Sequence, residues 1–195
     1  MINVKLKVML VFCNHVPDIS HKLNEIMDTT NEIFDGIVNV DIKLFPILVY
    51  LPSPGEMIYK RICLEPDNTK MTCLSLSRYC TSILRKYAKE IIKKYNVDTC
   101  IFVVDDVTSF YDFKKKIYVD VVYRPMPEVS GIIFRGCLAH GHLELIPIAI
   151  ACYLGLKPEC HNKCLMNPEL REKILCSECR RKLKELVENR GRNFM

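Results

Sequence analysis

The sequence predicts a compact α/β sandwich built around a mixed sheet. Short apolar runs typical of buried strands alternate with amphipathic helical patterns, and the elements follow the order strand, helix, strand, helix, strand, strand. The 195 residues are enough for one well-packed domain, with or without a small appendage. Hydrophobic residues make up 49% of the chain and charged residues 26%, which is ordinary for a globular protein, so no long disordered stretch is expected.

The first three elements occupy the N-terminal quarter of the chain. Residues 4–12 alternate between polar and apolar and then become wholly apolar, which predicts a central strand. Residues 18–33 place apolar side chains at helical spacings of three and four, with Asp18 as the cap and Gly36 as part of the stop. The apolar alternation of residues 38–44 then predicts a second strand.

The middle of the chain adds a loop, a helix and three strands. Three prolines and a glycine within residues 51–72 indicate a long surface loop. An amphipathic pattern then predicts a helix over residues 74–95. Residues 99–104 are the clearest buried strand of the sequence, and two further strands are expected at residues 117–122 and 130–134.

The C-terminal third opens with a helix that the sequence predicts to be buried. Residues 146–154 are apolar on every side and stop at Gly155. Pro147 falls in the first turn, where proline is tolerated because the N–H groups there have no partner within the helix. After this helix we expect a cysteine-bearing loop, a helix starting near residues 167–168 and a basic helical tail after Cys179.

The cysteine content indicates a reducing compartment. The chain has 11 cysteines, and an odd number cannot all pair. The first residues lack the charged region, apolar stretch and cleavage site of a secretory signal. The longest apolar run, residues 145–156, is shorter than the about 20 residues that a membrane-spanning helix needs. We therefore expect a cytoplasmic protein that makes no contact with membranes and whose cysteines bind metal or lie buried.

Four of the cysteines have the spacing of a structural zinc site: Cys160-x3-Cys164, then eleven residues, then Cys176-x2-Cys179. Zinc binds four soft ligands in a tetrahedron, and two short segments that each supply two sulfurs provide this geometry with little loss of chain entropy. The sequence therefore predicts one structural zinc ion on these four thiolates. Two alternatives stay open, because His161 could replace one thiolate and because Cys176 and Cys179 could instead form a redox pair.

Three stretches of the C-terminal third carry a resemblance to a known family. They are Tyr153-Leu154-Gly155-Leu156, then Cys160 with Cys164-Leu165-Met166-Asn167, then Cys176-x2-Cys179-Arg180-Arg181-Lys182-Leu183. Together they resemble the archaemetzincin family of zinc peptidases, whose members carry HExxHxxGxxH on and after the active-site helix, followed by a four-cysteine structural zinc site. The resemblance covers residues 98–183, and the N-terminal half only through its order of elements. It implies a metzincin-like fold, with residues 1–195 as a single archaemetzincin-like domain and residues 156–195 as its zinc-binding subregion.

The catalytic residues of that family are absent at the matching positions. With Gly155 on the family's helix-ending glycine, Ile148 falls on the first histidine, Ala149 on the glutamate and Cys152 on the second histidine. A catalytic zinc needs three protein ligands and an open position for water, and Ile148 and Ala149 offer no lone pair. The resemblance therefore implies a shortened pseudoenzyme without peptidase activity. Its remnant groove could hold an extended peptide or protein segment by strand addition at the sheet edge.

Two other functions stay open on the sequence. His140, His142 and Glu159 could supply displaced ligands to a second metal, with Glu144 as the base, which would make the chain an active zinc metallopeptidase. The basic residues that follow the zinc site could instead bind nucleic acid, as basic helices do in zinc-finger proteins, and the net charge of +5 permits this without requiring it. These residues are Arg180, Arg181, Lys182, Lys184, Arg190 and Arg192.

Overall fold

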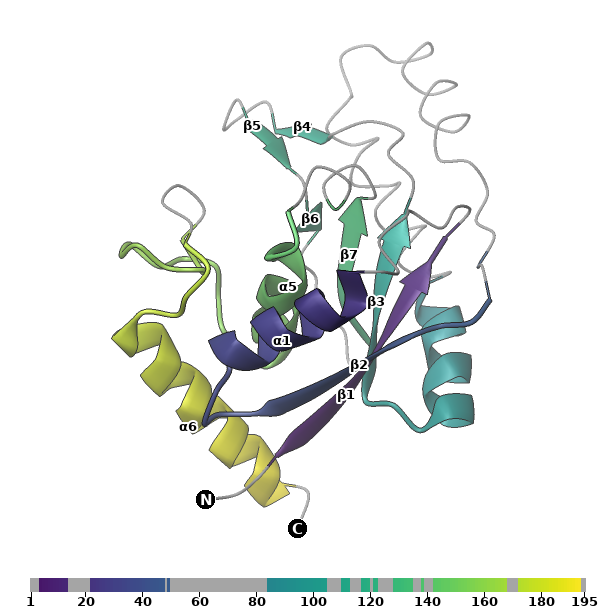
Figure 1. Ribbon diagram of the computed structural model, residues 1–195, viewed down its shortest axis with the longest axis horizontal. Helices are drawn as coiled ribbons and strands as arrows, with labels where there is room; N and C mark the ends of the chain where they lie inside the picture. Colours follow the sequence, from purple (N-terminus) through teal and green to yellow (C-terminus); the bar gives the residue numbers. More distant parts are fainter. Residues whose placement is uncertain are drawn as a thin grey trace.

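A five-stranded mixed sheet forms the centre of the molecule in the computed structural model (Figure 1). The structure describes residues 4–13, 22–47, 49, 84–104, 110–112, 117–119, 121–122, 128–134, 138, 142–167 and 172–193. The strand order is β2-β1-β3-β7-β6, with β1 at Lys5–Phe12, β2 at Asn39–Leu44, β3 at Thr99–Val104, β7 at Val129–Phe134 and β6 at Val121–Val122. The first four of these strands pair in parallel, and β6 is antiparallel to β7. The predicted mixed α/β class is confirmed.

Both faces of the sheet are covered, which explains why the second half of β1 and nearly all of β3 are apolar. Successive residues of a strand point to opposite faces. Leu10 of β1 and Ile101 of β3 pack with the buried side of helix α1 (Leu23–Ile33) and with helix α5 (Leu145–Tyr153). On the other face, Met9 and Phe102 pack against the helix of residues 84–95. A strand buried on both faces cannot show alternation, because both sets of side chains must be apolar.

Helix α5 is the most deeply buried helix that the structure describes. Eight of its nine residues are buried, and Pro147 lies within its first turn as predicted. It packs so closely on β7 that a Cβ atom at Gly131 would lie only 2.6 Å from the Cβ of Ala149. Such a distance leaves no room for a side chain, so the glycine lets the helix approach the sheet.

One sequence-based prediction of secondary structure was wrong. The single strand predicted at residues 117–122 is two strands, because β5 (Ile117–Val119) pairs with β4 (Phe110–Asp112) in a separate small sheet while β6 joins the main one. β5 pairs with the strand before it along the chain and β6 with the strand after it, and an apolar pattern does not report which strand is the partner. The helix predicted from residues 167–168 would begin in residues 168–171, which lie outside the described residues, and the next described helix, α6, covers Ser177–Asn193.

Several predictions fall on residues that the structure does not describe. These are the loop of residues 51–72, the Asp18 cap, His140, the first part of the helix at 74–95 and residues 168–171. Among the described residues, no helix combines the length and the apolar composition needed to cross a membrane.

Candidate metal centre

The four predicted zinc ligands come together in space. Cys160 and Cys164 lie on the loop after α5, Cys176 immediately precedes α6, and Cys179 lies in the first turn of α6. All four Sγ atoms are within 4.8 Å of one another, and no other group of three or more histidine, cysteine or acidic side chains converges in this way among the described residues. The cluster could hold one metal ion.

The spacing of the sulfurs fits a tetrahedral ion. Zinc–sulfur bonds of about 2.3 Å place neighbouring sulfurs about 3.8 Å apart. The Sγ atoms of Cys160 and Cys176 are 3.6 Å apart, which is far beyond the about 2.05 Å of a disulfide bond. All four cysteines are free thiols. The donor set and its spacing therefore suit a thiolate-bound metal.

Local backbone structure explains how α5 leads into the first cysteine segment. Gly155 has φ +107. The N–H of Gly155 donates to the carbonyl of Cys152 at 3.0 Å, and the N–H of Leu156 donates to the carbonyl of Ala151 at 3.0 Å. This pair of bonds is the Schellman arrangement that ends helices at a glycine with positive φ. The chain then turns away from α5 toward the metal centre.

Hydrogen bonds hold the two cysteine segments together. The N–H of Leu165 donates to the carbonyl of Ile174 at 2.6 Å, which joins the loop of the first pair to the segment before Cys176. The N–H of Cys160 donates to the carbonyl of Met166 at 3.2 Å, and so closes the first loop. These bonds place all four sulfurs in position through the backbone.

The environment of the sulfurs favours a thiolate at Cys176. Burial favours its neutral thiol, but hydrogen bonds from the backbone N–H of Cys179 and from the other three thiols outweigh burial and lower the pKa of Cys176 to about 7. Burial raises the pKa of Cys164 and of Cys179 above the usual value. The N-terminus of α6 adds a positive dipole end beside the cluster. Without a metal, hydrogen bonds from the neighbouring cysteines stabilise the Cys176 thiolate. A divalent cation would displace the protons of the other three thiols and bind all four sulfurs as thiolates.

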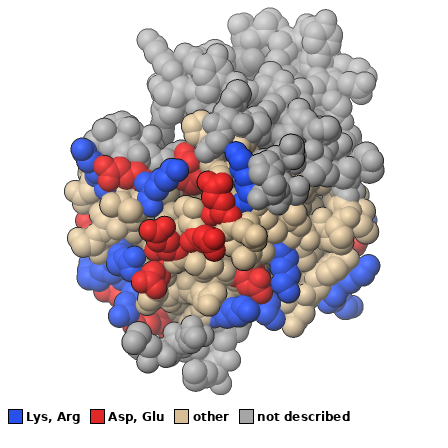
Figure 2. Space-filling model, in the orientation of Figure 1, with Lys and Arg blue, Asp and Glu red and all other residues tan. Residues whose placement is uncertain are grey.

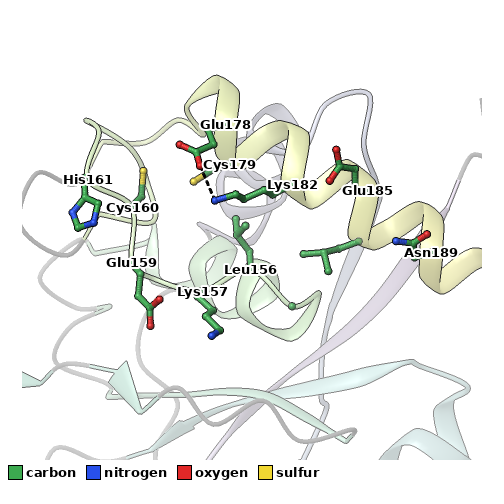
Figure 3. A pocket seen from close by; sticks show the side chains of 12 residues that line it. Leu156, Lys157, Glu159, Cys160, His161, Glu178, Cys179, Lys182, Glu185 and Asn189 are labelled. Carbon is green, nitrogen blue, oxygen red and sulfur yellow. Dashed lines mark ion pairs between the residues drawn. The ribbon is translucent and has the colours of Figure 1, made fainter.

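A groove of about 580 Å³ lies beside the metal centre (Figure 3). One wall is the chain leaving α5, with Lys157, Glu159 and His161, and the other is α6, whose Glu178 and Lys182 form an ion pair at 2.7 Å. His161 is exposed and is not part of the converging ligand group, so nothing in the geometry favours it over a thiolate.

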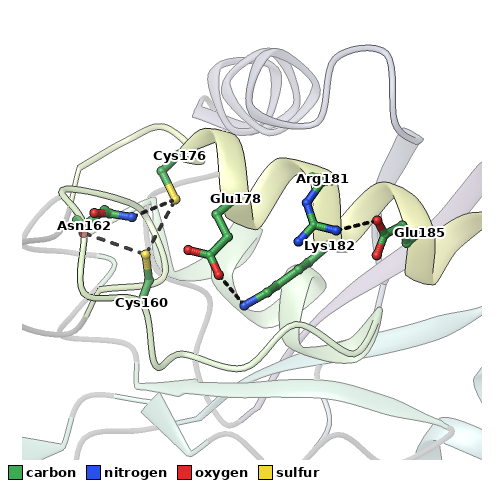
Figure 4. A network of polar contacts seen from close by, with 7 residues as sticks. All are labelled: Cys160, Asn162, Cys176, Glu178, Arg181, Lys182 and Glu185. Carbon is green, nitrogen blue, oxygen red and sulfur yellow. Dashed lines mark hydrogen bonds and ion pairs between the residues drawn. The ribbon is translucent and has the colours of Figure 1, made fainter.

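Sequence reasoning missed the contacts that Asn162 makes. Its Nδ2 donates to the Sγ of Cys176 at 3.9 Å, and its carbonyl accepts from the Cys160 thiol at 3.9 Å and from Nδ2 of Asn167 at 2.9 Å (Figure 4). The sequence indicates such contacts only through the two asparagines in this segment, Asn162 and Asn167. Side-chain amides can supply hydrogen bonds to backbone groups of a loop that have no partner in a helix or sheet.

Comparison with solved structures identifies proteins of similar fold. No model of a protein family matches the chain, and no curated protein does. Archaemetzincin from Methanopyrus kandleri is 15% identical with a TM-score of 0.52, covering 94% of this chain and 96% of its own. The chain has the archaemetzincin fold. A zinc-dependent peptidase from Methanocorpusculum labreanum is 14% identical with a TM-score of 0.47, covering 90% of this chain and 99% of its own.

In this archaemetzincin fold, the positions that the resemblance matched to catalytic residues lie in the core. Ile148 is 1% exposed, Ala149 0% and Cys152 4%. Ala149 faces Gly131 of β7 at the closest approach of helix and sheet. Burial raises the pKa of Cys152 to about 12, so at neutral pH its thiol is neutral and a poor nucleophile.

The displaced ligands do not form a second metal group in the described part of the chain. The Nδ1 atom of His142 lies 3.2 Å from Oε1 of Glu144, and the histidine is exposed. Glu159 lies on the groove wall and joins no converging group of ligands. His140 is outside the described residues.

The basic residues of α6 are mostly engaged within the chain. Arg180 donates to the carbonyl of Asp35 at 2.6 Å, Arg190 donates to that of Tyr153 at 2.6 Å, and Arg181 pairs with Glu185 at 2.6 Å. Acidic side chains gather in the middle of the face on which α1 lies (Figure 2). The exposed carboxylates of α1 and of the turn after it are Glu25, Asp28, Glu32 and Asp35. Three of the arginines named for the nucleic-acid alternative therefore make contacts within the chain.

Proposed function

We propose that the chain is a non-catalytic zinc-binding protein of archaemetzincin fold, with one structural zinc ion held by Cys160, Cys164, Cys176 and Cys179. The observation that carries the proposal is the convergence of the four sulfurs within 4.8 Å. Four protein ligands close the coordination sphere of zinc, whereas a catalytic ion keeps one position open for water. A closed sphere stabilises the fold and activates no water molecule.

The absence of peptidase chemistry is inferred from the residues themselves. A peptidase of this type needs imidazole ligands for the metal and a carboxylate to take the proton of the attacking water. Ile148 and Ala149 are hydrocarbon and buried, and they stand where the resemblance expects a ligand and that base. The matched positions therefore support packing in place of catalysis.

We further propose that the partner is an extended peptide or protein segment that pairs with the β6 edge of the sheet. The opposite edge is capped at Val40 of β2. The N–H of Val40 donates to Oδ1 of Asn31 at 2.8 Å, and Nδ2 of Asn31 donates to the carbonyl of Val40 at 3.0 Å. Sheet edges pair with added strands through their free N–H and carbonyl groups. Among the described residues no side chain bonds to the outer edge of β6, which makes β6 the edge that we propose for the added strand.

The same core supports a single domain over residues 1–195 with a zinc-binding subregion at residues 156–195. Leu165, Met166 and Leu183 of the subregion are buried in the cluster that also contains β1, α1 and α5. A cytoplasmic location accords with the four thiols of the cysteine cluster, none of which forms a disulfide.

Metal analysis and a cleavage assay test the zinc and activity proposals together. Elemental analysis of the purified protein should find one zinc per chain. Incubation with an unstructured protein, with and without a chelator, should give no cleavage that depends on metal. Two zinc ions per chain, or cleavage that the chelator stops, would show instead that displaced ligands make an active site.

Hydrogen exchange tests the binding site. Adding an excess of an unstructured peptide library should slow exchange of the Val121 and Val122 amides, while β2 amides stay unchanged. Protection of β2 with β6 unaffected would contradict the proposed edge.

A further inference from the structure

The four cysteines of the metal centre differ in their access to solvent. Cys164 and Cys179 are 0% and 6% exposed and belong to the core. Cys160 and Cys176 are only half-buried, whereas Cys179 stays buried although it lines the groove beside α6 together with Cys160 (Figure 3). Oxidation of sulfur depends on access as well as on thiolate character. The two outer sulfurs are therefore the ones that a dissolved oxidant reaches first.

The two outer sulfurs also face each other. Their Sγ atoms are 3.6 Å apart, so an approach of about 1.5 Å would bring them to the length of a disulfide bond. Asn162 contacts both of them, one through its side-chain amide and one through its carbonyl (Figure 4). Both cysteines lie in non-helical backbone, which can adjust, whereas Cys179 is fixed within α6.

We propose that Cys160 and Cys176 are a modification site, at which a peroxide converts the pair into a disulfide and so releases the metal ion. The inference rests on the proposed zinc centre. One sulfur attacks the peroxide, an S–O bond forms, the O–O bond breaks and the leaving oxygen departs as water after taking a proton. The second sulfur then attacks the sulfenic acid, the S–S bond forms and the S–O bond breaks, with release of a second water. In the metal-bound form the two sulfurs are thiolates, so two thiolates, one hydrogen peroxide and two protons from solvent give one disulfide and two waters.

The reaction has opposite effects on the metal and on the fold. Only Cys164 and Cys179 remain as thiolates, and two ligands do not hold zinc in a closed site. The new disulfide joins the same two segments that the metal joined, the loop after α5 and the start of α6. The oxidised chain therefore keeps a cross-link where it loses the ion, and a dithiol reductant returns it to the metal-binding form.

Peroxide titration of the full chain tests the proposal. Hydrogen peroxide at low molar excess is added to the zinc-loaded protein, and released zinc is followed with a chromogenic chelator. In parallel, differential alkylation and peptide mass mapping locate each disulfide. We expect one zinc released per disulfide, a mass loss of about 2 Da and a Cys160–Cys176 linkage in the peptide map. Addition of a dithiol and zinc should reverse both changes.

The matched variants are Cys160→Ser and Cys164→Ser, which each remove one sulfur of the four. Only Cys164→Ser keeps the outer pair, so it should form the disulfide and Cys160→Ser should not. Where either variant fails to fold, the map of the wild-type protein decides. A Cys164–Cys179 linkage, or zinc release with no Cys160–Cys176 disulfide, would overturn the inference and leave the zinc centre standing. A purified chain without zinc would overturn the proposed function, while the peptide mass map would still show whether Cys160 and Cys176 form a disulfide.

Discussion

At the scale of single residues, the sulfur of Cys176 carries more of the proposed function than any other atom that the structure describes. The Sγ atom of Cys176 is 3.6 Å from the Sγ of Cys160, and the pKa of the Cys176 thiol is lowered to about 7. The backbone N–H of the same residue donates to the Sγ of Cys164 at 3.3 Å. The position immediately before α6 puts it beside the positive end of the helix. These contacts make it the ligand whose loss should matter most.

Substitution Cys176→Ser should therefore abolish zinc binding and lower stability. Structural zinc sites contribute about 10–16 kcal/mol of apparent binding free energy at neutral pH, and part of it is folding free energy. We expect a drop in melting temperature that adding a chelator does not increase further, because the metal is already lost. Cys152→Ala is the control, since that thiol is buried away from the cluster and its loss should leave one zinc per chain. An unchanged melting temperature for Cys176→Ser would contradict a structural role.

A second residue-scale prediction concerns pH. Glu128, just before β7, accepts from Nε of Arg85 at 2.9 Å and lies 3.8 Å from Nζ of Lys89, and the Arg85 hydrogen bond is the main cause of its lowered pKa. A carboxylate whose pKa is lower in the folded state stabilises the fold above its unfolded pKa of about 4.3, and the contribution is lost as the pH falls through the folded value.

The variant Glu128→Gln should be less stable than wild type at pH 7, by about 0.2–1 kcal/mol because the pair lies near the surface. The difference should shrink as the pH falls through the lowered pKa of Glu128 and vanish at an acidic pH where the wild-type carboxyl is protonated as well. Urea unfolding at pH 7 and at that acidic pH measures it. Equal destabilisation at both pH values would show that packing and not charge accounts for the loss.

At the scale of elements, the sequence predicted what depends on local pattern and missed which elements pair with one another. The apolar run of α5, the buried β3 and the cysteine spacing all agree with the structure, since each is dictated by burial or by chelation within a short segment. The split of residues 117–122 into β5 and β6 was not predictable, because the apolar pattern is continuous while β5 pairs with the preceding strand and β6 with the following one. The contact of Asn31 with the β2 edge was not predictable either, because it joins a side chain of one element to the backbone of the next.

That edge gives the element-scale prediction. Replacement Asn31→Ala removes two hydrogen bonds to Val40 and frees its N–H and carbonyl at the outer edge of β2. Each lost bond should cost about 0.5–1.5 kcal/mol, and the freed edge should pair with other copies of the chain. Light scattering should thus rise with concentration. Asp28→Ala, on the exposed face of the same helix, is the control and should remain monodisperse. Absence of self-association in Asn31→Ala would mean that this side chain does not protect the edge.

At the scale of the whole molecule, the fold and the chemistry separate. The chain shares its architecture with archaemetzincin at 15% identity, yet the helix at the matching place is apolar throughout. If the fold alone determined activity, restoring the missing motif would restore the enzyme. The packing of α5 argues against that result. The residues to be replaced are 0–4% exposed, and Ala149 lies where a Cβ on Gly131 would be 2.6 Å away.

The triple variant Ile148→His, Ala149→Glu and Cys152→His should therefore lose stability without gaining peptidase activity. Burial of a carboxylate and two imidazoles without partners costs several kcal/mol, and the added volume at Ala149 must push α5 away from β7. Thermal melting, zinc content and a cleavage assay read out the three consequences. Ile148→Val with Cys152→Ala, which keeps the helix apolar, should lose less stability and retain one zinc. A triple variant that binds a second zinc and cleaves protein would show that the core can open into a site, and that the proposed lack of activity depends only on those three side chains.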